Sequence, residues 1–530
     1  METFKFTIRE ICELLGVAIP QSLIGYEKQE VNGIEARYSQ LTKQDIYFDI
    51  DPDEESFAKA DEIQCYFIVT AKKFNLNSTK TTIVRVEDPL EKYVELCQLL
   101  VNKFSKLTRI AIGGSSGKTS MKEMVSFVLG QIASTKKSFA NSNNILGLLK
   151  QMGTIKENNR FYVQEIGLKS DGNAKYTVKM AEAFSPNIAV LTNIGDNHKE
   201  AYGTKENIFY YKKSIVDFLV DDGIALLNKD DEYLRDYHPN ADSMYYSIKD
   251  SSADVYADNI LFENGRTIFD IIYKGELIKD IELQSLGVPN IYNALVTFAI
   301  AKLCNIDNES IIRALKKFKL EYATRCNYTN IAGYPMLIDC FNSSPESVKF
   351  DLDIIDNVDL CADNKKVVVL GDIVELGEDS ELLHRQLGGF LKDSSVDVLF
   401  LFGELTKYIY EEVNEGKPQV FYTTNRKELE NAIASMVKVG DLILWKASHS
   451  MHLELSIDNL WGTDLYALYP EDESEKLVHS TKLYEYSIYQ TGLKLLNCKI
   501  KSNSCMYFSI LRLEALSPSF DISRKMPQSR

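Results

Sequence analysis

From residue 107 onward, two kinds of segment alternate along the chain, and they differ in their pattern of apolar and polar positions. Short runs rich in β-branched and aromatic residues occupy 109–112, 161–166 and 188–192, and helical stretches such as 121–129 separate them. Strand-like runs that alternate with helical ones are typical of a parallel α/β sheet. In such sheets ligands bind at the carboxyl ends of the strands, so we expect the chemistry of this section there.

The same alternation returns after residue 334, with strand-like runs at 336–339, 366–370, 396–402 and 441–445. Before residue 105 the chain mixes helix-like and strand-like stretches and ends in an amphipathic segment, 90–104. After about residue 464 it becomes tyrosine-rich and irregular. We therefore predict an α/β fold with three domains, 1–104, 105–322 and 323–464, followed by an extension, 465–530, to which no function is assigned.

Composition narrows the class of protein. A chain of 530 residues is too long to fold around one compact core, and an average of about 150 residues per domain gives roughly three domains. A net charge of -16 argues against broad binding to nucleic acid or to an anionic membrane. No apolar run approaches the roughly 18 residues of a membrane span. The first ten residues carry acidic side chains and lack the basic start and apolar stretch of a signal peptide. We expect a cytoplasmic protein.

A glycine-rich turn, 113–120, joins the strand-like run 109–112 to the helical stretch 121–129. Glycines let backbone N–H groups converge on phosphate oxygens at a helix N-terminus. The Lys118 ammonium can then neutralise phosphate charge, and the Thr119 hydroxyl can ligate magnesium. This pattern predicts a phosphate site, although an ordinary strand-to-helix turn remains the alternative.

Two further polar side chains follow predicted strands. Glu165 stands near the end of the run 161–166, where a carboxylate can reach a magnesium ion held by a nucleotide. His198 closes the stretch 193–198, which follows the run 188–192. Taken alone, each residue is better explained as a solvated surface group than as a metal ligand.

Several motifs together resemble the Mur ligase family, and most closely its MurF branch. They are GSSGKTSMKEM at 114–124, TNIGDNH at 192–198, GVPNIYNAL at 287–295, VLGDIVELGE at 369–378 with the later His384, and KASHSM at 446–451. The resemblance covers about residues 105–463. It implies a central P-loop ATPase domain with a mainly parallel sheet and a Rossmann-like third domain.

The resemblance also implies the site residues, with ATP and Mg²⁺ as cofactors. Nucleotide contacts are expected from Gly114, Ser115, Ser116, Gly117, Lys118, Thr119, Ser120, Asn293, Arg325 and Asp339, and metal contacts from Thr119, Glu165, His198 and Lys212. The acyl substrate is expected at Asn143 and Asn144, and the catalytic set comprises Lys118, Lys212, His198 and Arg325. Lys212 matches a lysine that is carbamylated in the family. For Asn290, in the motif 287–295, the plain structural alternative is the N-cap of the following helix, a role that is compatible with nucleotide contact.

The resemblance implies an ATP-dependent ligase that forms an amide bond through an acyl-phosphate intermediate. The expected reaction adds D-alanyl-D-alanine to UDP-N-acetylmuramoyl-tripeptide in peptidoglycan precursor synthesis. We expect small-molecule substrates, no nucleic acid or membrane partner, and a monomer. The first domain departs from the family, because Glu35-Ala36-Arg37 replaces its Asp-Ser-Arg motif and the acidic segment 49–55 replaces a glycine-rich stretch. Acidic side chains repel a diphosphate. A Mur-type ligase of another pathway and a non-catalytic nucleotide-binding protein are therefore the alternatives.

Overall fold

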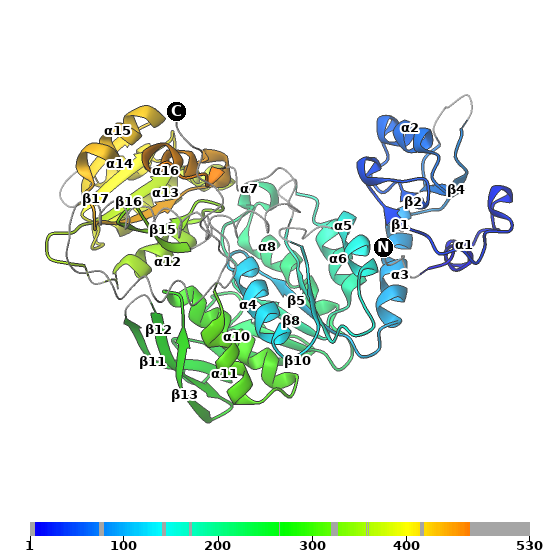
Figure 1. Cartoon of the computed structure of the whole chain (residues 1–530), viewed down its shortest axis with the longest axis horizontal. Helices are drawn as coiled ribbons and strands as arrows, with labels where there is room; N and C mark the ends of the chain where they lie inside the picture. Colours follow the sequence, from blue (N-terminus) through cyan, green and yellow to red (C-terminus); the bar gives the residue numbers. More distant parts are fainter. Residues whose placement is uncertain are drawn as a thin grey trace, which may run out of the picture. The chain divides into compact units, whose positions relative to one another are not determined.

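The computed structural model describes residues 6–73, 79–139, 145–168, 172–263, 266–319, 327–356, 358, 360–413 and 418–466 (Figure 1). These residues form three mixed α/β sections, each around its own sheet. The predicted α/β class is thereby confirmed. No helix in this part of the chain is long and apolar enough to cross a lipid bilayer.

The first section is a four-stranded parallel sheet in the order β1-β2-β3-β4. Its strands are short, β1 (Gly33–Glu35), β2 (Asp45–Phe48), β3 (Phe67–Thr70) and β4 (Ile83–Arg85), and its helices are α1 (Ile8–Leu15), α2 (Glu54–Ile63) and α3 (Pro89–Asn102). Thr7 and Glu10 form a capping box that satisfies backbone N–H groups at the start of α1.

The second section is a nine-stranded sheet in the order β13-β12-β11-β10-β9-β8-β5-β7-β6. Its strands are β5 (Thr108–Gly113), β6 (Thr135–Lys137), β7 (Phe161–Glu165), β8 (Ile188–Leu191), β9 (Ile224–Asn228), β10 (Asp242–Ser247), β11 (Val255–Glu263), β12 (Arg266–Tyr273) and β13 (Glu276–Leu283). Pairing is parallel from β6 to β11 and antiparallel from β11 to β13. The central strands are buried on both faces, which explains their continuous apolar runs.

The helices of this section follow its strands along the chain. They are α4 (Lys118–Gly130), α5 (Ile145–Gly153), α6 (Lys175–Phe184), α7 (Lys199–Tyr202), α8 (Lys205–Lys212), α9 (Ser214–Asp217), α10 (Val288–Leu303) and α11 (Asn308–Lys317). Helix α4 starts directly at the glycine-rich turn, and α10 packs beside it (Figure 1). The turn is therefore held between a buried strand and a buried helix.

The third section is a six-stranded sheet in the order β14-β15-β19-β16-β17-β18, parallel except for β14. Its strands are β14 (Asn327–Ile331), β15 (Tyr334–Asp339), β16 (Lys366–Gly371), β17 (Val398–Phe402), β18 (Gln419–Thr423) and β19 (Leu442–Lys446). Its helices are α12 (Pro345–Asp356), α13 (Ser380–Lys392), α14 (Lys407–Val413), α15 (Arg426–Met436) and α16 (Glu454–Trp461). All strand-like runs named above for the second and third sections are strands.

Candidate active site

The turn after β5 has a backbone that depends on glycine. Gly114 has a φ of +133°, and a Cβ atom there would lie 2.0 Å from the Thr192 hydroxyl oxygen. Gly117 has a φ of +80°. Asn193, just after β8, holds the loop with two hydrogen bonds of 2.9 Å. Its carbonyl accepts one from the Ser115 N–H, and its side-chain oxygen accepts the other from the Ser116 N–H. The close approach of two strand ends thus shapes a cradle for an anion.

Substituting Gly114 should therefore disrupt this cradle. We expect Gly114→Ala to weaken ADP binding by more than about tenfold, because overpacking of this kind costs about 1–3 kcal/mol. Isothermal titration calorimetry measures the affinity. Gly130→Ala, at the end of the following helix α4, is the matched control, since the nearest atom to its added Cβ is 4.0 Å away. Wild-type ADP affinity in Gly114→Ala would contradict this role of the turn.

Lys118 and Thr119 begin α4, and the side chain of each donates a hydrogen bond to a residue outside the helix. The Lys118 ammonium donates to the Ser115 carbonyl at 2.9 Å. The Thr119 hydroxyl donates to Oε2 of Glu165 at 2.8 Å, and both side chains are buried. The structure thus brings together two of the predicted metal ligands, one from the first turn of α4 and one from the end of β7.

A hydroxyl and a carboxylate oxygen fit a magnesium ion, which is usually held by one or two carboxylates together with substrate phosphates and water. Among the described residues, no group of three or more His, Cys, Asp or Glu side chains could hold a metal ion. Any metal held by Thr119 and Glu165 would therefore need further ligands from a nucleotide, from water or from a modified side chain.

Lys212, the last residue of α8, is buried beneath the loop. Its ammonium donates to the Gly114 carbonyl at 2.7 Å. Burial, together with the positive charge of Lys118, lowers the pKa of Lys212 well below its usual value. This environment favours the neutral, nucleophilic amine. The next residue, Lys213, instead pairs with Asp217 at 2.5 Å.

His198 precedes α7 with a left-handed φ of +67°. Its Nδ1 lies 3.0 Å from Oε2 of Glu375, a residue of the VLGDIVELGE motif, and this contact lowers the pKa of Glu375. Within the described part of the chain, no hydrogen bond or ion pair joins His198 to Thr119 or Glu165. The metal role of His198 stays a prediction.

The remaining nucleotide residues have separate surroundings. Asn293 is buried in α10. Asp339 ends β15, and its carboxylate pairs at 2.5 Å with the ammonium of Lys446 at the end of β19. The predictions for Asn143, Asn144 and Arg325 lie outside the described residues.

The structural alternative for Asn290, that it is the N-cap of the helix, is wrong. Helix α10 begins at Val288 and takes Gly287 as its N-cap, because Pro289 fits the first turn, where its missing N–H is not needed. Asn290 lies inside the helix and donates instead to the Leu286 carbonyl at 2.8 Å.

Three supporting residues lie at or just after the ends of β8 and β9 and were not assigned to the site from the sequence. The Thr192 hydroxyl donates to the Ser116 carbonyl at 2.7 Å, and the Asn228 amide donates to the Thr192 carbonyl at 2.9 Å. Asp231 accepts the Ile194 N–H at 2.8 Å. Thr192 belongs to the motif 192–198, and Asn228 and Asp231 lie at and just after the end of β9. These polar residues hold the loop that faces the phosphate turn.

Several carboxylates of the acidic segment that follows β2 accept hydrogen bonds from other residues of the fold. Asp49 is buried and accepts the Thr70 hydroxyl at 2.7 Å, and burial raises its pKa to about 6. Asp51 accepts the Tyr176 hydroxyl, and Asp53 caps α2 by accepting the Ser56 N–H at 2.8 Å. Since these carboxylates have structural partners, the segment is a weaker argument against a diphosphate substrate than its composition indicates.

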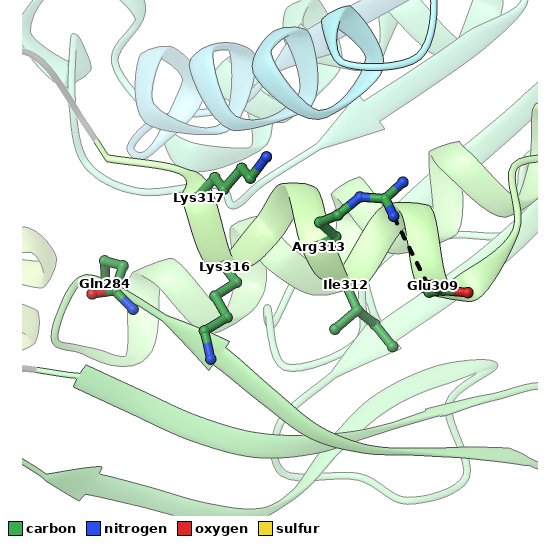
Figure 2. Close-up of a pocket in the computed structure, with 6 residues that line it drawn as sticks. All are labelled: Gln284, Glu309, Ile312, Arg313, Lys316 and Lys317. Carbon is green, nitrogen blue, oxygen red and sulfur yellow. Dashed lines mark ion pairs between the residues drawn. The ribbon is translucent and has the colours of Figure 1, made fainter.

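A pocket beside α11 contains none of the predicted site residues. It is lined by Gln284, Glu309, Ile312, Arg313, Lys316 and Lys317 (Figure 2). Arg313 lies 3.9 Å from Glu309, and Lys316 lies 2.5 Å from Glu282. Two of its cations are therefore already paired with carboxylates, and we assign it no role.

Two family models match the chain. The model described as Mur ligase middle domain matches residues 112–301, and the one described as Mur ligase, glutamate ligase domain matches residues 324–449. These matches cover the phosphate turn, β7, β8 and the sheet of the third section.

Curated relatives extend the similarity to nearly whole proteins. The chain is 26% identical over 471 residues to the UDP-N-acetylmuramoyl-tripeptide--D-alanyl-D-alanine ligase of Bacillus subtilis (strain 168), covering 86% of this chain and 98% of that one. It is 31% identical over 360 residues to the ligase of the same name from Buchnera aphidicola subsp. Baizongia pistaciae, covering 67% and 75%.

Solved structures share the fold. MurF from Acinetobacter baumannii matches with a TM-score of 0.75 and 20% identity, over 87% of this chain and 100% of that one. MurF ligase from Thermotoga maritima, solved in complex with ADP, matches with a TM-score of 0.70 and 22% identity, over 82% and 98%. The three-domain α/β architecture is thus that of these structures. On the sequence matches above, the chain belongs to the Mur ligase family.

Proposed function

We propose that the chain is an ATP-dependent ligase that adds D-alanyl-D-alanine to UDP-N-acetylmuramoyl-tripeptide in peptidoglycan precursor synthesis. The observation that carries this proposal is the similarity to ligases of that name, which spans 98% of the Bacillus subtilis protein. The phosphate turn with Lys118, and the Thr119–Glu165 pair beside it, supply the groups that such a ligase needs.

The reaction divides into two steps. The carboxylate of the tripeptide attacks the γ-phosphorus of ATP, and the bond from phosphorus to the bridging oxygen breaks to release ADP. The resulting acyl phosphate is attacked by the free amine of D-alanyl-D-alanine, which forms the amide, loses a proton and releases phosphate. Both steps build negative charge on phosphate oxygens, so positioned cations and backbone N–H groups accelerate them.

The chain's own residues have distinct tasks in this scheme. Backbone N–H groups at the start of α4 and the Lys118 ammonium bind and orient the β- and γ-phosphates. Thr119 and Glu165 would hold Mg²⁺, assisted by His198 and a carbamylated Lys212. Bound there, the ion would neutralise charge on the phosphoryl oxygens as a Lewis acid.

Residues elsewhere complete the proposed site. Arg325 would meet the γ-phosphate, Asn293 and Asp339 the nucleoside, and Asn143 and Asn144 the acyl substrate. We further propose that the protein acts as a cytoplasmic monomer on small molecules and that its domains follow the boundaries predicted above. The family resemblance supports these assignments.

A pair-dependence assay tests the function. ADP release is measured with UDP-N-acetylmuramoyl-tripeptide alone, with D-alanyl-D-alanine alone, and with both. We expect strong stimulation only by the two together, because the acyl phosphate turns over when an amine captures it. Absence of stimulation by the pair, in protein that binds ADP, would refute this choice of substrates.

A further inference from the structure

Lys122 is a fully buried lysine in α4, one turn after Thr119. Its ammonium lies 3.1 Å from Oε1 of Glu123 and 4.0 Å from Oε2 of Glu165. Residues three apart on a helix lie on the same face, so Lys122 and Thr119 both reach the end of β7. The Glu165 oxygen that accepts the Thr119 hydroxyl is also the one nearest to Lys122.

These groups belong to a chain of alternating charges. Glu165 faces Lys122, Lys122 pairs with Glu123, and the second oxygen of Glu123 pairs with Lys137 at the end of β6. Burial alone would raise the pKa of Glu123, but the ammonium groups of Lys122 and Lys137 lower it. An ion buried in this way costs several kcal/mol unless its partners stay in place. The network therefore holds its members in one arrangement.

The backbone of Glu165 is held as well. Its N–H donates to the hydroxyl of Ser138 at 3.1 Å, and the N–H of Ser138 donates to the Val163 carbonyl at 2.8 Å. Only the side chain of Glu165 can then change its orientation, and its contacts with Thr119 and Lys122 fix that orientation. Lys122 cannot itself bind a cation, because an ammonium has no lone pair.

We propose that Lys122 is a positioning residue, which keeps the Glu165 carboxylate directed at the magnesium site. This inference rests on the proposed function, in which Glu165 is a metal ligand. Lys122 differs from Lys118, whose ammonium lies at the loop carbonyl of Ser115, where phosphate is expected to bind. Residues that orient metal ligands typically change metal affinity by about 10- to 100-fold when mutated.

The test measures ADP binding by calorimetry over a series of Mg²⁺ concentrations. In Lys122→Met we expect the Mg²⁺ concentration at half effect to rise about 10- to 100-fold. ADP affinity at saturating Mg²⁺ should stay near that of the wild type. Lys137→Met is the matched control, because it removes the other cation of Glu123 but does not reach Glu165. Its Mg²⁺ dependence should be unchanged.

A double variant covers the case in which Lys122→Met does not fold. Lys122→Met/Glu123→Gln removes both local charges and restores charge balance, but it still leaves Glu165 without its cation. We expect this variant to fold and to need more Mg²⁺, whereas a merely structural role would leave its requirement at the wild-type level. Wild-type Mg²⁺ dependence in either folded variant would overturn the proposal.

Glu165→Gln separates this inference from the assignment on which it rests. If Glu165→Gln raises the Mg²⁺ requirement and the Lys122 variants do not, the metal site stands and the role of Lys122 is refuted. If Glu165→Gln also leaves the Mg²⁺ dependence unchanged, the proposed metal site itself is refuted, and the role of Lys122 with it.

Discussion

Lys118→Ala is expected to lower the rate of ATP turnover by about a thousandfold or more. The side chain places its ammonium across the phosphate turn, 2.9 Å from the Ser115 carbonyl. Removing a group that stabilises transition-state charge in a desolvated site costs about 10²- to 10³-fold, and here nucleotide binding is weakened as well. A coupled assay of ADP release, with both proposed substrates present, measures the rate.

The fold should survive this substitution, because the Lys118 side chain lies on the loop and is only partly buried. Thermal unfolding close to that of the wild type would show this. Lys106→Ala is the control, since this exposed lysine precedes β5 at the opposite end of the strand. Retention of more than a few per cent of the wild-type rate in Lys118→Ala would contradict the phosphate site.

Lys212→Ala is expected to reduce ligase activity by about a hundredfold, the upper range for residues that support a metal site. An unmodified ammonium would repel magnesium, whereas a carbamate supplies the hard oxygen ligands that this ion prefers. The lowered pKa of Lys212 favours the neutral amine, the form that adds carbon dioxide. A carbamate nitrogen also keeps one N–H for the Gly114 carbonyl, so the observed contact can persist.

Chemical rescue distinguishes this role from a structural one. Formate or acetate at high concentration should restore part of the activity of Lys212→Ala, because either anion replaces the missing carboxylate. Lys213→Ala is the matched control and should be nearly silent, since Lys213 pairs with the surface residue Asp217. If Lys213→Ala were inactive and Lys212→Ala fully active, Lys213 and not Lys212 would be the lysine that supports the metal.

The parts of the fold that were predicted from the sequence are those with a strong local signal. Strands β5, β7 and β8 are buried on both faces, so their apolar runs stand out. The position of Glu165 at a strand end followed from the rule for parallel sheets. By contrast, the antiparallel strands β11 to β13 and the three- and four-residue strands of the first section were not predicted, because short or half-exposed strands carry little pattern.

The site was harder to predict where its contacts join distant segments. His198 meets Glu375, and Asp339 meets Lys446, across more than a hundred residues of sequence, and neither pairing has a local signal. Lys122 would be taken for a surface residue from its position in a helix, since an isolated lysine is rarely fully buried. Its burial depends on two carboxylates that only the folded chain brings together.

Isotope transfer tests the central claim most directly. UDP-N-acetylmuramoyl-tripeptide, labelled with ¹⁸O in its reacting carboxylate, is incubated with ATP, Mg²⁺, D-alanyl-D-alanine and the protein, and the products are analysed by mass spectrometry. The account predicts the dipeptide-extended product together with inorganic phosphate that carries one ¹⁸O from the carboxylate. Extended product with no label in the phosphate would contradict the acyl-phosphate route, and absence of the extended product would contradict the ligase itself.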